Sequence, residues 1–194
     1  RTRIGDPCDL TRRPASLAIT TVTVKRSGSY VLHWRDPEKV AHAGGLYQVM
    51  PVGVFQPLTE GEDGRGEHED LDLWRCMVRE FSEELLGTSE DYRPGFNQES
   101  WPFHRTLSRV RAQGRLRVHC LGLGADPLTL AVDLLTVAVF DDALFDDLFG
   151  GLVSVNAEGS VRLAPFDGTV PSPMQPAGAA ALGLAWRHRS FLLG

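Results

Sequence analysis

The sequence of 194 residues has few cysteines, no long apolar run and no excess of positive charge. Its three cysteines, Cys8, Cys76 and Cys120, are widely spaced, which argues against a disulfide framework or a zinc knuckle and favours reduced cytoplasmic thiols. No apolar stretch approaches the length of a membrane span, and no signal-peptide pattern opens the chain. We therefore expect a cytoplasmic protein with no membrane partner.

The formal net charge is -5, and this acidity narrows the possible ligands. Repulsion from the phosphates makes such a domain a poor binder of bare nucleic acid, so we expect no direct nucleic-acid contact. An anionic small substrate would need a metal ion or a local cluster of Arg to offset the same repulsion. The hydrophobic content of 42% and the charged content of 23% are those of a globular domain.

The chain divides into a short lead-in and one larger unit. Residues 1–15 are basic, contain two prolines and predict a lead-in or linker. The sequence does not begin with Met, so we expect it to be a piece of a longer protein. Residues 16–194 predict a single domain with a C-terminal helical extension. Strands and helices alternate along it, which predicts an α/β or α+β fold class.

The expected elements follow from β-branched runs, helical periodicity and turn residues. Strands are predicted over 16–24, 30–35, 46–57 with breaks at Pro51 and Gly53, two within 116–140 joined by a turn at 124–127, and a hairpin over 151–166 with its turn at 157–159. Helices are predicted over 70–86, 101–114, 141–149 and 173–194. A loop is expected over 36–45, and the acidic, Gly-rich residues 58–70 predict a mobile surface loop.

The helix over 70–86 carries the segment "REFSEELLG", in which three glutamates occupy five positions. Asp70 or Asp72 is placed to cap this helix, and Gly87 to end it. An α-helix turns about 100° per residue. With Glu80 at zero, Glu83 falls at about -60° and Glu84 at about +40°, so the three carboxylates share one arc.

Carboxylates three and four residues apart on a helix repel one another by a few tenths of a kcal/mol per pair. A bound cation relieves this repulsion, and oxygen ligands of this kind suit Mg²⁺, Mn²⁺ or Ca²⁺ rather than zinc. The simpler explanation is a solvated helix face, because glutamate is a good helix former. The glutamates alone leave both explanations open.

The segment from Arg79 to Gly87 resembles the core of the Nudix box, written G-x5-E-x7-R-E-U-x-E-E-x-G-U, where U is a bulky apolar residue. The upstream stretch "VMPVGVFQP" resembles the "LPGGxxEp" approach to that box, and the order of segments from about residue 16 to 87 agrees with the family. Gly53 and Arg79 are separated by 25 residues where the pattern has 13. The difference predicts an insertion within 58–70. The pattern's earlier Glu falls on Leu71, where Asp70 and Asp72 are candidate replacements.

The resemblance implies a Nudix-like mixed β-sheet between helices. It also implies that Glu80, Glu83 and Glu84, with the backbone carbonyl of Gly53, bind Mg²⁺ or Mn²⁺. Glu83, Glu80 and Arg79 would be the catalytic residues, with Arg79 orienting a carboxylate. The implied activity is hydrolysis of a nucleoside diphosphate linked to another group, so the expected partner is a nucleotide-type small molecule.

Two alternatives to this enzyme remain at the level of sequence. A Nudix-like domain of a bacterial regulator would bind the same kind of ligand as a sensor without cleaving it, which suits the altered front half of the box. A scaffold for protein contacts is the second alternative. The apolar stretch 128–140 and the Ala-rich C-terminal helix then supply a homodimer face, although core packing explains them equally well.

Some residues outside the box also merit attention. Many family members use a further acidic residue as a base or ligand, and the candidates here are Glu99, Asp126, Asp133, Asp141 and Asp142. We interpret Cys76 as a small residue that fills space rather than a nucleophile. Contacts to a base or phosphate are conceivable for Trp34, Arg35, Tyr47, His104 and Arg105, although packing or surface exposure is the simpler interpretation of each.

Overall fold

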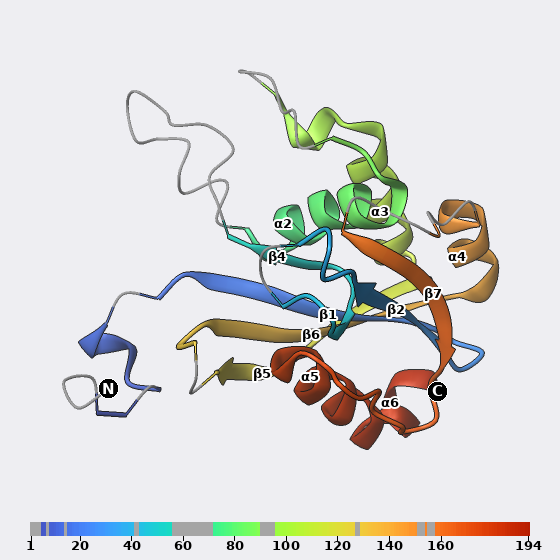
Figure 1. Ribbon diagram of the computed structural model, residues 1–194. Helices are drawn as coiled ribbons and strands as arrows, with labels where there is room; N and C mark the ends of the chain where they lie inside the picture. The colour runs from blue at the N-terminus through green and yellow to red at the C-terminus, as the bar shows by residue number, and fades with distance from the viewer. Residues whose placement is uncertain are drawn as a thin grey trace.

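The computed structural model describes residues 5–6, 8–13, 15–40, 43–55, 72–89, 96–126, 129–150, 154 and 158–194. Within them a mixed sheet lies between two sets of helices, with α2, α3 and α4 over one face and α5 and α6 over the other (Figure 1). The predicted fold class, α and β elements with a mixed sheet between helices, is confirmed.

Seven strands form the sheet in the described part of the chain. They are β1 (Leu17–Lys25), β2 (Ser29–Arg35), β3 (Tyr47–Val49), β4 (Val52–Val54), β5 (Leu116–Ala125), β6 (Val132–Phe140) and β7 (Gly159–Pro165). The main path runs β3-β2-β1-β6-β5, while β4 pairs with β1 and β7 pairs with β2. Only β1 and β6 pair in parallel among these described strands, so the sheet is mixed.

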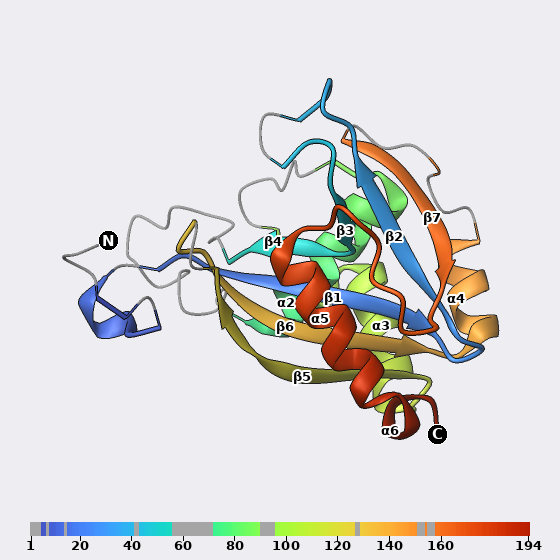
Figure 2. The ribbon, with the colours of Figure 1, turned by 60° about the horizontal axis from the view of Figure 1, so that its bottom comes forward.

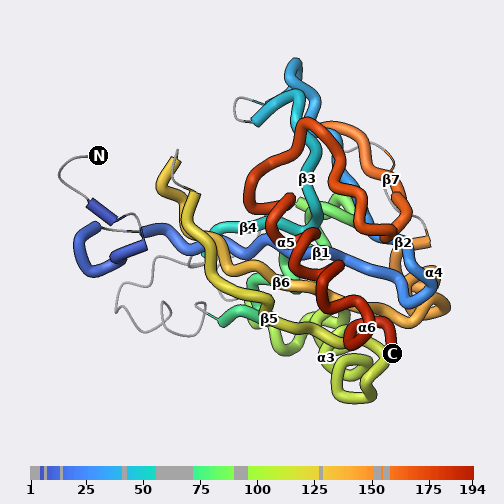
Figure 3. The backbone as a smooth tube through the Cα atoms, turned by 90° about the horizontal axis from the view of Figure 1, so that it is seen from below, coloured from blue at the N-terminus to red at the C-terminus, as the bar shows by residue number. Residues whose placement is uncertain are grey.

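The helical segments cover both faces of this sheet. They are η1 (Leu10–Arg12), α2 (Leu73–Glu80), η2 (Phe81–Leu85), η3 (Gln98–Ser100), α3 (Pro102–Ala112), α4 (Asp142–Phe149), α5 (Pro176–Arg187) and α6 (Arg189–Leu193). Figure 2 shows α5 lying across β1 and β6. In Figure 3, η1 lies beyond one end of the sheet, far from the C-terminal α6. None of the described helices is long and apolar enough to cross a membrane.

The alternation of side chains along the central strands builds two hydrophobic cores. On β1, Ile19 packs beneath α2, α3 and α4, whereas Val22 and Val24 point to the opposite face and pack against α5. The first core is centred on the aromatic rings of Phe81, Phe140 and Phe149, which lie 5.6 to 5.8 Å apart. Phe81 belongs to the segment Arg79–Gly87, which resembles the Nudix box. This core therefore fixes the helix formed by α2 and η2, which carries the glutamates and is called the box helix below.

Most of the predicted elements are present, with three differences at their ends. The third strand is broken at Met50 and Pro51, but Gly53 lies inside β4 rather than ending it, since it pairs with Ile19 of β1. β5 continues to Ala125, past the predicted start of its turn. The C-terminal helix is interrupted at His188, which separates α5 from α6.

Two other expectations concern segments that lie partly outside the described residues. The hairpin predicted over 151–166 has its second arm in β7, which pairs with β2 along its whole length and whose Val161 N–H also donates to the Ser154 carbonyl of the first arm at 2.9 Å. Its first arm falls mostly outside the described residues, as does the predicted loop at 58–70. The apolar stretch 128–140 contributes β6, which lies between β1 and β5 and supplies both cores. Packing in the two cores therefore accounts for the apolar residues of this stretch, and the homodimer stays a prediction.

The two ends of the box helix follow the sequence prediction. The Asp72 side chain accepts a hydrogen bond of 2.8 Å from the backbone N–H of Arg75, which is the N-cap contact. Gly87 has a φ of 68°, and its N–H donates to the Glu83 carbonyl at 3.0 Å. A left-handed residue at this position ends a helix, and glycine adopts that conformation without steric cost.

Replacing Asp72 by Ala is expected to lower the free energy of unfolding by about 1 kcal/mol, because the first turn of α2 loses its cap. Chemical denaturation measures the change. Replacing Asp9 by Ala is the matched control, since Asp9 caps only the short η1, which buries no residue. A similar loss in both variants would contradict a specific contribution from Asp72.

The interior of the box helix differs from the prediction of one regular α-helix. The α-helical hydrogen bonding of α2 gives way after Glu80 to the π-helical segment η2, which contains Glu83 and Glu84. A π-helix bonds residue i to i+5, so each residue advances by less than the angle of an α-helix. The arc computed with about 100° per residue therefore does not describe the relative directions of the three glutamates.

Candidate functional site

The Glu80 carboxylate lies directly against Gly53 in β4. A Cβ atom built on Gly53 would meet Oε1 of Glu80 at 2.0 Å and its Cγ at 2.5 Å. Only a residue without a side chain allows this approach of strand and helix. The structure thus brings together two of the predicted site residues that are far apart in sequence.

Glu84 contacts the neighbouring residue of the same strand. Its Oε2 accepts a hydrogen bond of 3.2 Å from the backbone N–H of Val52. Burial raises the pKa of Glu84 well above its ordinary value, and the charge of Glu80 raises it further. Glu80 and Glu84 therefore interact with each other beside β4. The repulsion between two carboxylates at this place would favour a bound cation.

Glu83 lies in the same π-helical segment and is partly buried. The charge of Glu83, like that of Glu80, raises the pKa of the Cys76 thiol. Within the described ranges, no three His, Cys, Asp or Glu side chains are grouped closely enough to hold a metal ion. Glu80, Glu83 and Glu84 are therefore not grouped in this way in the structure, and their joint binding of a metal ion stays a prediction.

Arg79 is buried and contacts a residue that the sequence did not single out. Its Nη1 donates a hydrogen bond of 3.0 Å to Oε1 of Gln98, and Nε2 of Gln98 donates to the backbone carbonyl of Arg75 at 2.8 Å. Gln98 thereby connects η3 to the box helix and holds the guanidinium. The expected contact of Arg79 with a carboxylate stays a prediction.

Cys76 is fully buried in the core beneath the box helix. Burial raises the pKa of its thiol to about 12, with a further contribution from the charge of Glu80. A thiol of this kind is protonated at neutral pH and is a poor nucleophile. The interpretation of Cys76 as a residue that fills space agrees with this environment.

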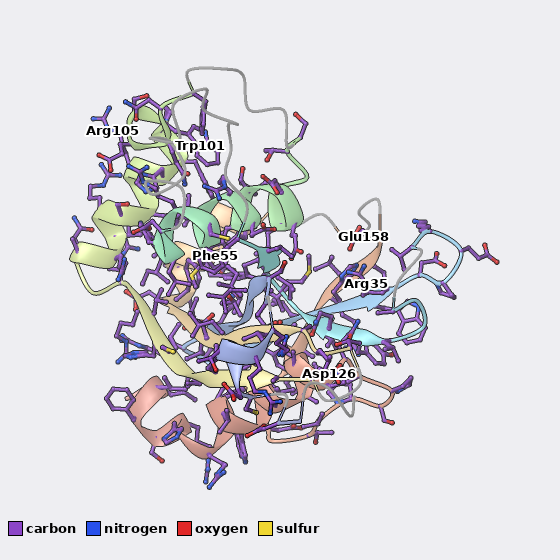
Figure 4. The ribbon with its side chains drawn as sticks, turned by 90° about the vertical axis from the view of Figure 1, so that its left-hand side faces the viewer. Arg35, Phe55, Trp101, Arg105, Asp126 and Glu158 are labelled. Carbon is purple, nitrogen blue, oxygen red and sulfur yellow. The ribbon has the colours of Figure 1, made fainter. Side chains whose placement is uncertain are left out.

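An ion pair next to this site was not anticipated. Nη1 of Arg35, at the end of β2, donates to Oε2 of Glu158 at 2.7 Å, and the charges of both residues act on Glu84. Figure 4 shows the two side chains next to each other. Glu158 precedes β7, so only the pairing of β7 with β2 brings it here, and no local sequence signal marks it.

Asp133 lies on the face of the sheet opposite to the box helix. On β6 it alternates with Leu134, which packs against the core beneath α2, and shares its direction with Leu135 and Val137 of the other core. Its Oδ1 accepts a hydrogen bond of 2.8 Å from Thr20. Burial raises the pKa of Asp133, but its position separates it from the glutamates of the box.

The other acidic candidates have structural partners. Asp142 accepts hydrogen bonds from Ser27 in the turn between β1 and β2, and Asp141 forms ion pairs with Arg26 at 3.1 Å and Arg115 at 3.6 Å. Glu99 forms an ion pair with Arg75 at 2.9 Å. The charge of Asp126 raises the pKa of Asp133, so Asp126 lies near Asp133 rather than near the glutamates of the box helix.

Among the residues named as possible ligand contacts, two pack on each other. The rings of Trp34 and Tyr47 meet edge to face at a centroid distance of 4.8 Å on β2 and β3. His104 is buried on α3, and Arg105 is exposed on the same helix.

The chemistry of the residues near Gly53 fits a hard divalent ion. Glu80 and Glu84 offer carboxylate oxygens beside β4, and the lack of a side chain at Gly53 admits the Glu80 carboxylate. Mg²⁺ and Mn²⁺ prefer such oxygen ligands, whereas the buried and protonated Cys76 is unsuited to a softer metal.

No protein-family model and no curated protein matches this chain. The solved structures include a similar one described as a Nudix hydrolase, RenU, from M. smegmatis. It is 13% identical in sequence, and the match covers 92% of this chain and 84% of that chain with a TM-score of 0.39.

Proposed function

We propose that this chain is a metal-dependent hydrolase of the Nudix type that cleaves a nucleoside diphosphate linked to another group. The observation that carries the proposal is the contact of the Glu80 carboxylate with Gly53, beside the hydrogen bond from Val52 to Glu84. The glutamates come from the segment that resembles the box, and Gly53 comes from the segment that resembles its approach. Two independent parts of the resemblance therefore meet at one place.

In this proposal Glu80, Glu83 and Glu84, with the Gly53 carbonyl, hold Mg²⁺ or Mn²⁺. The ion supplies positive charge that neutralises the diphosphate and favours ionisation of water. The chain itself holds the carboxylates in place: the Val52 N–H fixes one oxygen of Glu84, and packing of Phe81 fixes the helix. Glu83 and Glu80 are the proposed acceptors for the proton of the water that attacks phosphorus, while the bridging oxygen leaves.

A screen of ADP-ribose, sugar nucleotides, dinucleotides and nucleoside triphosphates with Mg²⁺ or Mn²⁺ tests the function. We expect turnover of at least one class, and a loss of about 100-fold or more in kcat/KM when Glu83 is replaced by Gln. Replacing the exposed Glu38 by Gln is the control, because it makes the same chemical change away from the site. Equal turnover by the Glu83→Gln variant would contradict the proposed role of the glutamate.

The screen also separates the enzyme from a ligand-binding sensor. A nucleotide that raises the melting temperature of the protein without being cleaved would identify a binding domain, because a ligand that binds only the folded state stabilises it. Neither cleavage nor stabilisation by any nucleotide would contradict both functions.

A further inference from the structure

The ion pair of Arg35 and Glu158 is built on backbone that the sheet holds in place. The N–H of Arg35 donates to the Leu46 carbonyl at 3.0 Å, and the Arg35 carbonyl accepts from the N–H of Gly45 at 2.8 Å. Next to them, the carbonyl of Glu158 accepts a hydrogen bond of 2.8 Å from the N–H of Asp36. Both residues therefore stand on a rigid frame, as a binding residue requires.

The Arg35 side chain points to the face of the sheet that the box helix covers. Side chains alternate along β2, so Arg35 has the same direction as Val31, which packs in the core beneath α2. The positive charge of Arg35 also opposes the rise in the pKa of Glu84. The direction of the side chain and its electrostatic effect thus agree in placing Arg35 near the carboxylates of the proposed metal site.

Glu158 brings a further negative charge to the same neighbourhood. This charge raises the pKa of Glu84, as the charge of Glu80 does. A carboxylate next to a site for an anionic substrate repels that substrate. Arg35 offsets the charge while the two side chains are paired, with its Nη1 at 2.7 Å from Oε2 of Glu158. Ion pairs that are open to solvent contribute little to stability, so stability alone does not account for a pair at this place.

The two partners differ in their exposure to water. The side chain of Glu158 is 46% exposed, whereas that of Arg35 is 20% exposed. Glu158 can therefore turn into water at small cost while the guanidinium stays beside the site. A guanidinium binds two oxygens of a phosphate in the same planar geometry as two oxygens of a carboxylate. A diphosphate at the proposed metal site can therefore replace Glu158 as the partner of Arg35.

We propose that Arg35 is a substrate-binding residue, which leaves Glu158 and binds the diphosphate when the substrate and its metal ion enter the site. This inference rests on the proposed hydrolase function and adds to it a contact from outside the box segment. The metal ion neutralises part of the diphosphate charge, and the guanidinium neutralises a further part. Because Glu158 competes for the same guanidinium, it lowers the affinity of the site for the substrate.

Methylenediphosphonate, a diphosphate analogue whose bridging carbon resists hydrolysis, tests this contact by calorimetry in the presence of Mn²⁺. We expect the Arg35→Gln variant to have a dissociation constant about 10-fold higher or more, because charge-assisted hydrogen bonds are lost. The Arg35→Lys variant is expected to retain part of the affinity, since lysine keeps the charge but lacks the planar fork.

Replacing Arg162 by Gln is the matched control. It removes the same charge from the neighbouring strand β7, but the exposed Arg162 pairs with Leu32, whose side chain packs in the core on the α5 face of the sheet. This variant is expected to bind methylenediphosphonate as the wild type does. Equal weakening in Arg35→Gln and Arg162→Gln would reduce the effect to general screening and overturn the inference, as would unchanged binding in Arg35→Gln.

Replacing Glu158 by Gln tests the exchange of partners. If the carboxylate competes with the diphosphate, the variant binds methylenediphosphonate about 2- to 5-fold more tightly than the wild type. If the carboxylate only holds the guanidinium in place, the variant binds it more weakly, and the exchange is wrong. Thermal unfolding without ligand verifies that each variant is folded. Should Arg35→Gln fail to fold, Arg35→Lys and Glu158→Gln keep the inference testable.

The Glu80→Gln variant separates this inference from the proposed function. The wild type is expected to bind methylenediphosphonate only with Mn²⁺, and Glu80→Gln to lose that binding. If this result is obtained while Arg35→Gln binds normally, the function stands and the role of Arg35 is wrong. If the wild type does not bind at all, the proposed metal site is contradicted and the inference falls with it. With a cleaved substrate, Arg35→Gln is expected to raise KM more than it lowers kcat, as the loss of a binding contact does.

Discussion

Replacing Glu80 by Gln is expected to make the metal-free protein more stable while lowering its Mn²⁺-dependent turnover by about 100-fold or more. The two effects have one cause. Glu80 and Glu84 interact as like charges near β4, and without an ion this repulsion opposes folding. Removing one charge relieves about 0.5 kcal/mol of repulsion but also removes an oxygen that the ion requires.

Thermal unfolding with and without Mn²⁺ measures both effects on the same samples. The wild type is expected to gain stability on adding Mn²⁺, and the Glu80→Gln variant to gain little. The Glu38→Gln variant, altered at an exposed residue, is expected to follow the wild type. If Glu80→Gln destabilises the metal-free protein, the carboxylate serves the fold and the interpretation of the pair is wrong.

The stability of the metal-free protein is expected to fall as pH rises, because the pKa of Glu84 is raised in the folded state. Burial and the charge of Glu80 raise the pKa of Glu84 above its unfolded value. The folded state then binds this proton more tightly than the unfolded state does, so stability is lost as pH rises from the unfolded pKa towards the folded one. We expect the metal-free wild type to show this decline and the Glu80→Gln variant to show a smaller one.

Local features of the chain were predictable because local physics determines them. The cap at Asp72 and the terminator at Gly87 depend on side-chain hydrogen bonding and on a backbone conformation suited to glycine. The hairpin of β1 and β2 follows from β-branched runs around a short turn, and its register places Val24 opposite Tyr30.

The parts that the sequence did not reveal depend on contacts between distant segments. Glu158 reaches the neighbourhood of Glu84 only through the pairing of β7 with β2. Asp133 lies on the face away from the box helix because of the parallel register of β6 on β1, which an apolar run does not specify. The change to π-helical hydrogen bonding after Glu80 was also invisible, since the residues of η2 satisfy an α-helical pattern equally well.

Replacing Gly53 by Ala is expected to reduce Mn²⁺ affinity and turnover by an amount comparable to the loss of Glu80. The new Cβ would occupy the space of the Glu80 carboxyl group, approaching its Oε1 to 2.0 Å and its carboxyl carbon to 2.1 Å. Rotation of the carboxyl group alone does not relieve the overlap, because Cγ of Glu80 would also be only 2.5 Å away. The whole side chain or the helix must move, at a cost of about 1–3 kcal/mol in stability.

Replacing Gly183 by Ala is the matched control, because a Cβ there meets no atom within 4 Å and lies in α5. That change is expected to stabilise the protein by about 0.5–1 kcal/mol, since alanine favours a helix over glycine. Combining Gly53→Ala with Glu80→Gln separates sterics from charge: if the glycine serves to admit Glu80, the double variant loses little more activity than either single variant. Independent and additive losses would show that Gly53 acts through something other than the position of Glu80.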